Sequence, residues 1–281
     1  LEHRGRLLMI DCGEGAQLSM RRQGLSFSRL GHIFISHLHG DHCLGLPGLL
    51  STMALQQKGG AVTVHTFADG IAEFRRIMDY FCRERPFELR FEAVDPRQGG
   101  VVLDGGGLTV AAFPLRHRVP CVGYLVREAD KPRHLRGDMV RFLQIPVSRL
   151  HGIKFDGEGY TTPDGRVFTN DQLTTGPSHS ASYAYCSDTL YDPTIVDRVA
   201  GADVLYHEAT YADDALDRAA ARFHSTASQA AMIARDAGVG QLVLGHFSKS
   251  YRNEQRHLAE AQAIFPNTIL ADEGLTIDID G

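Results

Sequence analysis

The sequence has no tryptophan, only five cysteines and no long apolar run. No stretch approaches the roughly 18 apolar residues of a membrane-spanning helix, and no basic-then-apolar leader opens the chain, so we expect neither membrane insertion nor secretion. The cysteines are odd in number and widely spaced, which argues against a disulfide framework or a cysteine-type zinc ribbon. This pattern fits a reducing compartment, and we predict a cytoplasmic location.

The most unusual feature of the composition is its histidine content. The 281 residues are 43% hydrophobic and 22% charged, which is enough to bury a core. The net charge of −5 gives no overall attraction for nucleic acid. Histidine is the commonest metal ligand and a common general acid or base, so the 14 histidines need an explanation.

Short apolar segments alternate with segments of helical spacing along most of the chain. Strands are predicted over 6–11, 32–36, 62–67, 87–94, 108–114, 123–127, 183–187, 203–206, 242–245 and 268–271. Helices are predicted over 16–23, 47–57, 69–83, 193–199, 226–237 and 254–265, with Asp69 as a cap and a glycine-rich turn at 99–107. Residues from about 128 to 180 are polar and turn-rich, with one weak helix near 138–143. The pattern predicts a single α/β domain over 1–281, of two or four layers, with an irregular insertion.

The densest chemical signal runs from His37 to His42, directly after a predicted strand. It places His37, His39, Asp41 and His42 within six residues. Such a group is costly to bury unless something binds it, and neutral imidazole and carboxylate are zinc ligands. A plainer interpretation is a loop of solvated histidines. The position at a strand end, where loops carry chemistry, favours a metal site.

Three further candidates stand just beyond predicted strands, as His37 does: His117, Asp188 and His246. Alone, each is more often an ordinary polar residue at a strand end. Together with the cluster they make seven donors, which is enough for two zinc sites if one ligand bridges. Two metals about 3.5–4 Å apart clamp the attacking and leaving oxygens of a phosphoryl displacement.

The string from His37 to Leu50 resembles the ribonuclease Z family of the metallo-β-lactamase superfamily, whose motif is His-x-His-x-Asp-His after a strand. Four shorter strings are similar to the same family: Asp11-Cys12-Gly13-Glu14, Ser187-Asp188-Thr189, His207-Glu208-Ala209-Thr210 and His224-Ser225-Thr226. Each is weak alone, but five in the family's order along nearly the whole chain are specific. The resemblance implies the metallo-β-lactamase fold, a four-layer αββα sandwich with an inserted flexible arm.

The resemblance also implies two zinc ions per subunit and divides the seven donors between them. His37, His39 and His117 would hold one ion, and Asp41, His42 and His246 the other. Asp188 would bridge the two ions. Asp41 would in addition orient or deprotonate the attacking water.

The implied activity is that of a zinc-dependent endoribonuclease that removes the 3′ trailer from precursor tRNA. The products would be a 3′-hydroxyl on the tRNA and a 5′-phosphate on the trailer. His224 would be the general acid that protonates the leaving 3′-oxygen; without the family it is an ordinary histidine near a helix start. His207 and Glu208 would orient a ligand or the acid from behind, a role close to that of a buried hydrogen-bonded pair.

Charge is unevenly distributed along this acidic chain. Residues 127–154 contain seven Lys and Arg against three acids, a net charge of +4, which leaves −9 for the remainder. In the resembled family an insertion here, at about 128–180, forms an arm that grips tRNA and acts across a homodimer. The candidate RNA contacts are basic side chains of this segment: Lys131, Arg133, Arg136, Arg141 and Arg149. The alternative is a solvated loop of incidental charge.

Two features depart from the family pattern. The sequence begins at what would be the family's second strand, after a first strand and a Gly-Thr loop, and the arm's usual Gly-Pro pair falls on Ser148-Arg149. Two alternative functions stay open. One is another hydrolase on this fold, such as a general phosphodiesterase, thioesterase or lactonase; the other is a non-catalytic tRNA-binding protein. Asp41, a bridging Asp188 and the basic segment favour phosphodiester hydrolysis, and a scaffold needs no seven convergent donors.

Overall fold

The structure, a computed structural model, describes residues 1–279. These residues form two compact units. The larger unit consists of residues 1–126 and 182–279, and the smaller one of residues 127–181. Among the described residues no helix has both the length and the apolar character that crossing a membrane requires.

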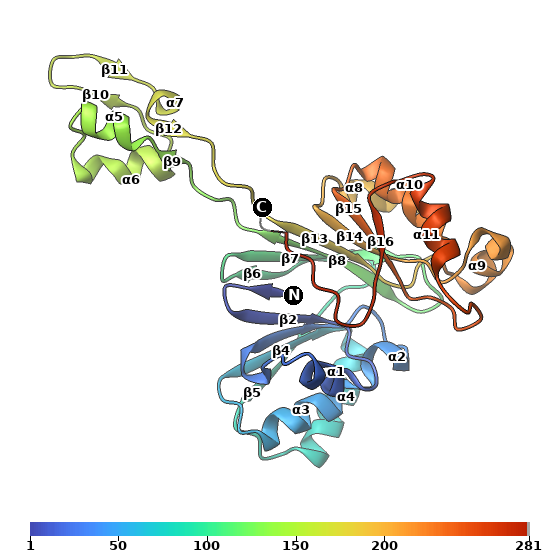
Figure 1. Cartoon of the computed structure of the whole chain (residues 1–281). Helices are drawn as coiled ribbons and strands as arrows, with labels where there is room; N and C mark the ends of the chain where they lie inside the picture. The colour runs from blue at the N-terminus through green and yellow to red at the C-terminus, as the bar shows by residue number, and fades with distance from the viewer. Residues whose placement is uncertain (280–281) are drawn as a thin grey trace. The chain divides into compact units, whose positions relative to one another are not determined.

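The N-terminal half of the larger unit builds a five-stranded sheet in the order β1-β2-β3-β4-β5 (Figure 1). Its strands are β1 (Glu2–His3), β2 (Arg6–Ile10), β3 (Leu30–Phe34), β4 (Ala61–Thr66) and β5 (Glu88–Ala93). Strands β2 to β5 run parallel, so their carboxyl ends share one edge. Helices α1 (Ala16–Arg22), α3 (Leu46–Leu55) and α4 (Ala68–Phe81) pack on one face, where Ile33 of β3 and Leu49 and Met53 of α3 are buried in one cluster.

The second sheet has seven strands in the order β16-β15-β14-β13-β8-β7-β6. They are β6 (Gly100–Gly105), β7 (Leu108–Leu115), β8 (Cys121–Glu128), β13 (Ser182–Cys186), β14 (Val204–Glu208), β15 (Gln241–Gly245) and β16 (Thr268–Leu270). Strands β13 to β16 run parallel. The helices that follow these strands are α8 (Val196–Val199), α9 (Leu216–Arg222), α10 (Ala227–Ala237) and α11 (Gln255–Gln262). Short 3-10 turns cover Phe27–Arg29, Pro193–Ile195 and Asp213–Ala215.

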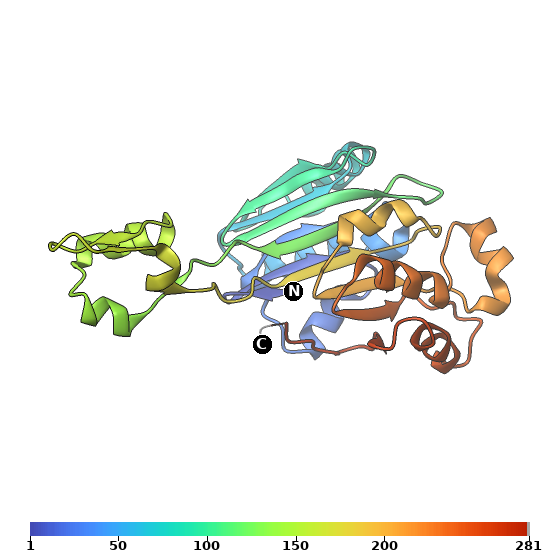
Figure 2. The same cartoon turned by 90° about the horizontal axis from the view of Figure 1, so that it is seen from above.

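The two sheets pack face to face. Phe34 from β3 and Val110, Val122 and Tyr124 from the second sheet share one buried cluster. Because side chains alternate along a strand, Ile33 faces the helices while Phe34 faces the other sheet. The hydroxyl of Tyr124 donates to the Ile35 carbonyl at 2.8 Å. Figures 1 and 2 show the sheets between α1, α3 and α4 on one side and α8, α10 and α11 on the other. The predicted α/β fold of four layers is confirmed.

The smaller unit has more regular structure than the one weak helix predicted near 138–143, which corresponds to α5 (Gly137–Phe142). The other helices are α6 (Val147–Phe155) and α7 (Asn170–Leu173). Two short ribbons pair β9 (His134–Leu135) with β12 (Thr174–Thr175), and β10 (Tyr160–Thr161) with β11 (Val167–Phe168). A core of its own holds it together: Leu143, Ile145, Ile153 and Leu173. The insertion expected at about 128–180 lies within this unit, and its role as a flexible tRNA-binding arm stays a prediction.

Two local expectations were wrong. The segment expected to be only a turn contains strand β6, which pairs antiparallel with β7. The glycines on both sides of Val101, Val102 and Leu103 suggested a turn, whereas these three side chains and the pairing with β7 support a strand. Asp69 is not a helix cap: α4 begins one residue earlier, with Phe67 at the N-cap. The Phe67 side chain is buried between the sheets, and Asp69 lies in the first turn, where a negative charge suits the helix dipole.

Candidate metal centre

The candidate site lies where carboxyl ends of strands from both sheets meet. After β3 the chain reaches His37 and then the short helix α2 (Gly40–Cys43), which carries Asp41 and His42. His117 follows β7, Asp188 follows β13 and His246 follows β15. An antiparallel bridge between His37 and Cys121 and a bond from the Val122 amide to the Ser36 carbonyl (2.9 Å) join the two sheets here. Tertiary structure thus collects donors that are far apart in sequence.

Two glycines permit the close approach of two loops at this edge. A Cβ on Gly13 would lie 2.0 Å from the backbone oxygen of Asp41, and one on Gly45 would lie 1.9 Å from the Gly13 oxygen. Both distances are far below any van der Waals contact. The loop after β2 can therefore pack against the histidine-rich loop only if both positions lack a side chain.

The first group of donors is His37, His39, His117 and Asp188, whose candidate ligand atoms all lie within 4.8 Å of one another. The Nε2 of His37 is 3.0 Å from the Nδ1 of His39 and 3.7 Å from Oδ2 of Asp188. Oδ2 is also 3.8 Å from the Nε2 of His117. Burial, reinforced by the neighbouring imidazoles, lowers the pKa of His37 to about 2, so this ring is neutral and has a lone pair to offer.

The second group is Asp41, His42 and His246, again within 4.8 Å. Here the other oxygen of Asp188 takes part: Oδ1 lies 3.5 Å from His42 Nε2 and 3.2 Å from His246 Nε2. Although burial opposes it, the carboxylates of Asp41, Asp188 and Glu208 raise the pKa of His246 to about 9. The two oxygens of Asp188 therefore face different groups, and the second group is a strongly anionic environment that suits a cation.

His224 lies beside both groups with its Nδ1 held by Glu208. The distance from His224 Nδ1 to Glu208 Oε1 is 2.8 Å. Glu208 is fully buried and also accepts from the Thr189 amide and from the Thr210 amide and hydroxyl. A third set of donors within 4.8 Å joins Asp188, His224 and His246, so distance alone also allows a ligand role for His224.

His207 has different hydrogen-bond partners from Glu208. His207 is the fourth residue of β14 and Glu208 the fifth, so neither lies beyond the strand as expected, and the His207 side chain is buried. Its Nδ1 donates to the Glu208 carbonyl at 2.7 Å. Glu208 thus contacts the predicted acid directly, whereas the recorded bond of His207 is to the backbone of its neighbour.

Relatives named ribonuclease Z match nearly the whole chain. The ribonuclease Z of Bacteroides fragilis strain YCH46 is 48% identical over 277 residues, which covers 98% of this chain and 90% of the relative. The chain belongs to the ribonuclease Z family. The ribonuclease Z of Phocaeicola vulgatus is 47% identical over 277 residues, with 99% and 89% of the two chains covered. A family profile described as "Anti-Pycsar protein Apyc1" matches residues 1–68.

Solved structures agree with the fold of a ribonuclease Z. The crystal structure of the short form of human tRNase Z superposes with a TM-score of 0.69 at 25% identity, covering 99% of this chain and 90% of that chain. The metallo-β-lactamase fold protein YhfI from Bacillus subtilis gives 0.66 at 18% identity, covering 98% and 88%. The predicted family and fold are confirmed. The family and the donor cluster together imply a metal cofactor.

The residues of this ribonuclease Z family chain fit a metal. His37 Nε2 and His39 Nδ1 lie 3.0 Å apart, and the pKa of His37 is so low that its ring is neutral. Imidazole and carboxylate donors that converge from four chain segments are typical of zinc sites. A bound cation would offset the repulsion between the nitrogen and carboxylate lone pairs that face one another here.

Sequence reasoning gave no role to two residues that hold ligand candidates from behind. Asp11 binds the Nδ1 of His42 at 2.8 Å, and the Thr210 hydroxyl lies 2.8 Å from the Nδ1 of His246. Asp11 ends a predicted strand and begins one of the strings that resemble the family, and these were the available signals. Thr210 ends another of those strings, but a hydroxyl after a strand is common and gave no further signal.

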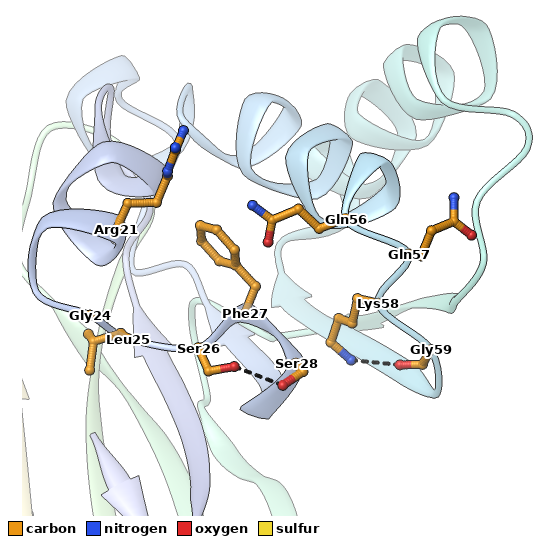
Figure 3. A pocket seen from close by; sticks show the side chains of 10 residues that line it. All are labelled: Arg21, Gly24, Leu25, Ser26, Phe27, Ser28, Gln56, Gln57, Lys58 and Gly59. Atoms are coloured by element: carbon orange, nitrogen blue, oxygen red, sulfur yellow. Dashed lines mark hydrogen bonds between the residues drawn. The ribbon is translucent and has the colours of Figure 1, made fainter.

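A separate surface pocket of about 440 Å³ lies at the opposite end of the parallel strands (Figure 3). Phe27 and Ser28 precede β3, and Gly59 precedes β4, whereas His37 follows β3. Its lining residues include neither an imidazole nor a carboxylate, and Lys58 Nζ donates to the Gly59 carbonyl at 3.0 Å. We therefore place the candidate chemistry at the histidine cluster.

Proposed function

We propose that this chain is a zinc-dependent endoribonuclease that removes the 3′ trailer from precursor tRNA. Its products would be a 3′-hydroxyl on the tRNA and a 5′-phosphate on the trailer. Membership of the ribonuclease Z family supports the reaction. The observation that carries the chemistry is the pair of donor groups that share Asp188, next to a histidine held by a buried carboxylate.

Seven residues would hold two zinc ions. His37, His39 and His117 would bind one ion, Asp41, His42 and His246 the other, and Asp188 both. Ions in these positions supply Lewis acidity toward the phosphate and lower the pKa of a water molecule. The Asp41 side chain is 70% exposed, so its carboxylate can also reach and orient a water that approaches from solvent.

His224 would donate the proton that the departing 3′-oxygen needs. The bond to Glu208 holds its Nδ1, which leaves Nε2 as the nitrogen that can donate. Glu208 is itself fixed by three donors from Thr189 and Thr210. The acid is thus oriented by a rigid strand end, which is what proton transfer at a fixed atom requires.

Ion pairs within the smaller unit reduce the number of basic side chains that are available to contact RNA. Residues 127–181 contain eight basic and seven acidic side chains, so the unit as a whole is nearly neutral. Four of the five nominated residues form ion pairs: Lys131 with Glu128, Arg133 with Asp171, Arg136 with Asp138 and Arg149 with Glu158.

Arg141 and Lys154 take part in none of the ion pairs found among residues 1–279, and each directly precedes an exposed phenylalanine in the sequence. Phe142 is 72% exposed and Phe155 57%. The ammonium of Lys154 lies 5.4 Å from the centre of the Phe155 ring. Free positive charge next to exposed aromatic rings suits phosphates and unstacked bases. We propose that these residues carry most of the arm's contact with tRNA.

We further propose a homodimer in which the arm of one subunit serves the centre of the other. Mixing an inactive Asp41→Ala variant with the weakly binding variant Arg141→Ala, Lys154→Ala tests it, at a precursor tRNA concentration well below the KM of the second variant. A dimer with exchange of arms should regain activity, because every heterodimer holds one intact centre served by one intact arm. No gain over the separate variants would refute the exchange.

The five cysteines are free in the structure, which supports the proposed cytoplasmic location.

Mapping the product ends on precursor tRNA, with and without a chelator, tests the function. We expect cleavage at the 3′ side of the tRNA, with the stated ends, and loss of activity on metal removal. A small phosphodiester is assayed in parallel. Hydrolysis of the small ester with no cleavage of precursor tRNA would favour a general phosphodiesterase, and chelator-resistant cleavage would contradict the metal mechanism.

A further inference from the structure

We propose that Asp11 is a positioning residue shared by the two halves of the metal centre. Its carboxylate holds His42 directly and His37 through Ser36. The inference rests on the proposed metal-binding function. It gives a role to a side chain that belongs to neither donor group.

Asp11 lies behind His42, at the ring nitrogen opposite the Nε2 that faces Asp188. Its Oδ2 is 2.8 Å from His42 Nδ1, and the Ser36 hydroxyl and the Tyr185 hydroxyl donate to the same oxygen at 2.8 and 2.9 Å. Oδ1 accepts from the Ser36 amide at 2.7 Å. Four donors thus surround a side chain that is 10% exposed, so both oxygens are occupied.

The bonds of Ser36 extend this control to His37. The Ser36 hydroxyl is 3.0 Å from His37 Nδ1. It has one proton, and a carboxylate is the strongest acceptor within reach, so that proton goes to Asp11. The Ser36 oxygen must then accept from His37 Nδ1–H. His37 and His42 are both left with an Nε2 lone pair, and in both rings Nε2 is the atom that faces Asp188.

The backbone at Asp11 is strained and firmly held. Its φ of +59° lies in the left-handed region, which a residue with a Cβ rarely adopts. The amide of Asp11 donates to the Phe34 carbonyl and that of Cys12 to the His42 carbonyl, both at 2.8 Å. Such strain persists where surrounding bonds over-determine it, and it concentrates at functional sites.

The larger unit contains a matched carboxylate for comparison. Asp203 Oδ2 accepts from the amide and the hydroxyl of Ser182 at 2.7 and 2.8 Å, nearly the same bonds that Asp11 makes with Ser36. Ser182 begins β13, whereas Asp188 follows the end of that strand, so this pair lies away from the donors. A loss caused only by breaking an aspartate–serine motif should be the same in both places.

The experiment compares Asp11→Asn with Asp203→Asn in the full chain. Zinc affinity is measured by competition with a chromophoric chelator, ligand geometry by the visible spectrum after Co²⁺ loading, and stability by thermal unfolding of the chelated protein. We expect Asp11→Asn to weaken zinc binding at both sites about 10–100-fold and to change the cobalt spectrum. Asp203→Asn should lower stability at most, with zinc affinity unchanged.

Ser36→Ala removes the link from Asp11 to His37 but leaves the bond from Asp11 to His42. It therefore tests the proposal even if Asp11→Asn does not fold. It should weaken only one of the two sites, since His42 keeps its direct bond. Wild-type zinc affinity and cobalt spectrum in Asp11→Asn, or in Ser36→Ala, would overturn the proposal, as would an equal loss in Asp203→Asn. Failure of the proposed function is seen separately, as wild-type protein that binds zinc but leaves precursor tRNA intact.

Discussion

At the scale of the residue, the centre is built from histidines whose outer nitrogens are bound. Six of the 14 histidines lie at the cluster, and five of them have Nδ1 within hydrogen-bond distance of a group behind the ring. Those groups are the side chains of Ser36, Asp11, Glu208 and Thr210 and the carbonyl of Phe223. This leaves Nε2 facing inward. His39 differs, because its Nδ1 faces His37 and His117.

Replacing His224 with alanine tests its role as an acid. We expect kcat on precursor tRNA to fall about 10²–10⁴-fold with zinc content unchanged, because the 3′-oxygen loses its proton donor. Hydrolysis of bis(4-nitrophenyl) phosphate should fall far less, since its leaving group needs no proton. Steady-state rates on both substrates provide the check. Equal losses accompanied by lost zinc would instead identify His224 as a ligand.

Asp188→Ala should lower zinc content at both sites, whereas His246→Ala should lower it at one. The reason is geometric, since Oδ2 of Asp188 faces His37 and His117 while Oδ1 faces His42 and His246. Atomic emission on gel-filtered protein gives the number of ions per chain. Two retained ions in Asp188→Ala would contradict the bridging role.

At the scale of the element, strand ends and tight loops position the chemistry. Helix α10 shows how a local signal does this: Thr226 and Gln229 form a capping box, which fixes the N-cap two residues after His224. The loop after β2 acts differently. It packs its backbone against the Asp41 backbone, and Gly13 is the residue that makes this contact possible.

Gly13→Ala should therefore disrupt zinc binding. Its new methyl group would lie 2.0 Å from the Asp41 carbonyl oxygen, and the loop that carries Asp41 and His42 would have to move. Gly48→Ala is the control: it lies in α3, and the nearest atom to a new Cβ is Gln17 Nε2 at 3.9 Å. That variant should bind zinc normally and gain up to about 1 kcal/mol of stability from helix propensity. Zinc titration and urea unfolding measure both effects, and normal zinc binding in Gly13→Ala would refute the argument.

At the scale of the whole molecule, two compact units divide the proposed work. The larger unit contains all the metal donors, and the smaller one has a core of its own. The predicted positive segment is partly neutralised by acids that lie beyond it in sequence, at Glu158 and Asp171. The net charge of residues 127–154 thus overstates the positive potential at the surface of the folded smaller unit.

The double variant Arg141→Ala, Lys154→Ala should raise KM for precursor tRNA several-fold and reduce its salt dependence, because two phosphate contacts are lost. Hydrolysis of the small phosphodiester should be unchanged. Arg166→Ala is the matched control, since this arginine of the same unit is paired with Asp164. KM values at two salt concentrations decide the outcome. Equal effects in the control, or a parallel loss on the small ester, would refute a role for these two residues in tRNA binding.

Much of the fold could be predicted, and the exceptions share a cause. The buried strands β3, β4, β13 and β15 have strong apolar patterns, so their existence was evident from the sequence. Helix α6 was missed, because only Ile153 of its residues is buried and Gly152 interrupts the pattern. Its stability comes from contacts with Leu143, Ile145 and Leu173, which only the folded unit brings together.

The sequence by itself determined the family and the candidate donors, because residue types in a fixed order encode both. Only the tertiary structure decided which atoms face one another. It divided the oxygens of Asp188 between two groups, placed Glu208 against His224 and set Asp11 behind His42 and Ser36. It also paired most of the arm's arginines with acids. Such pairings depend on distances between strands far apart in the chain, and no local pattern carries that information.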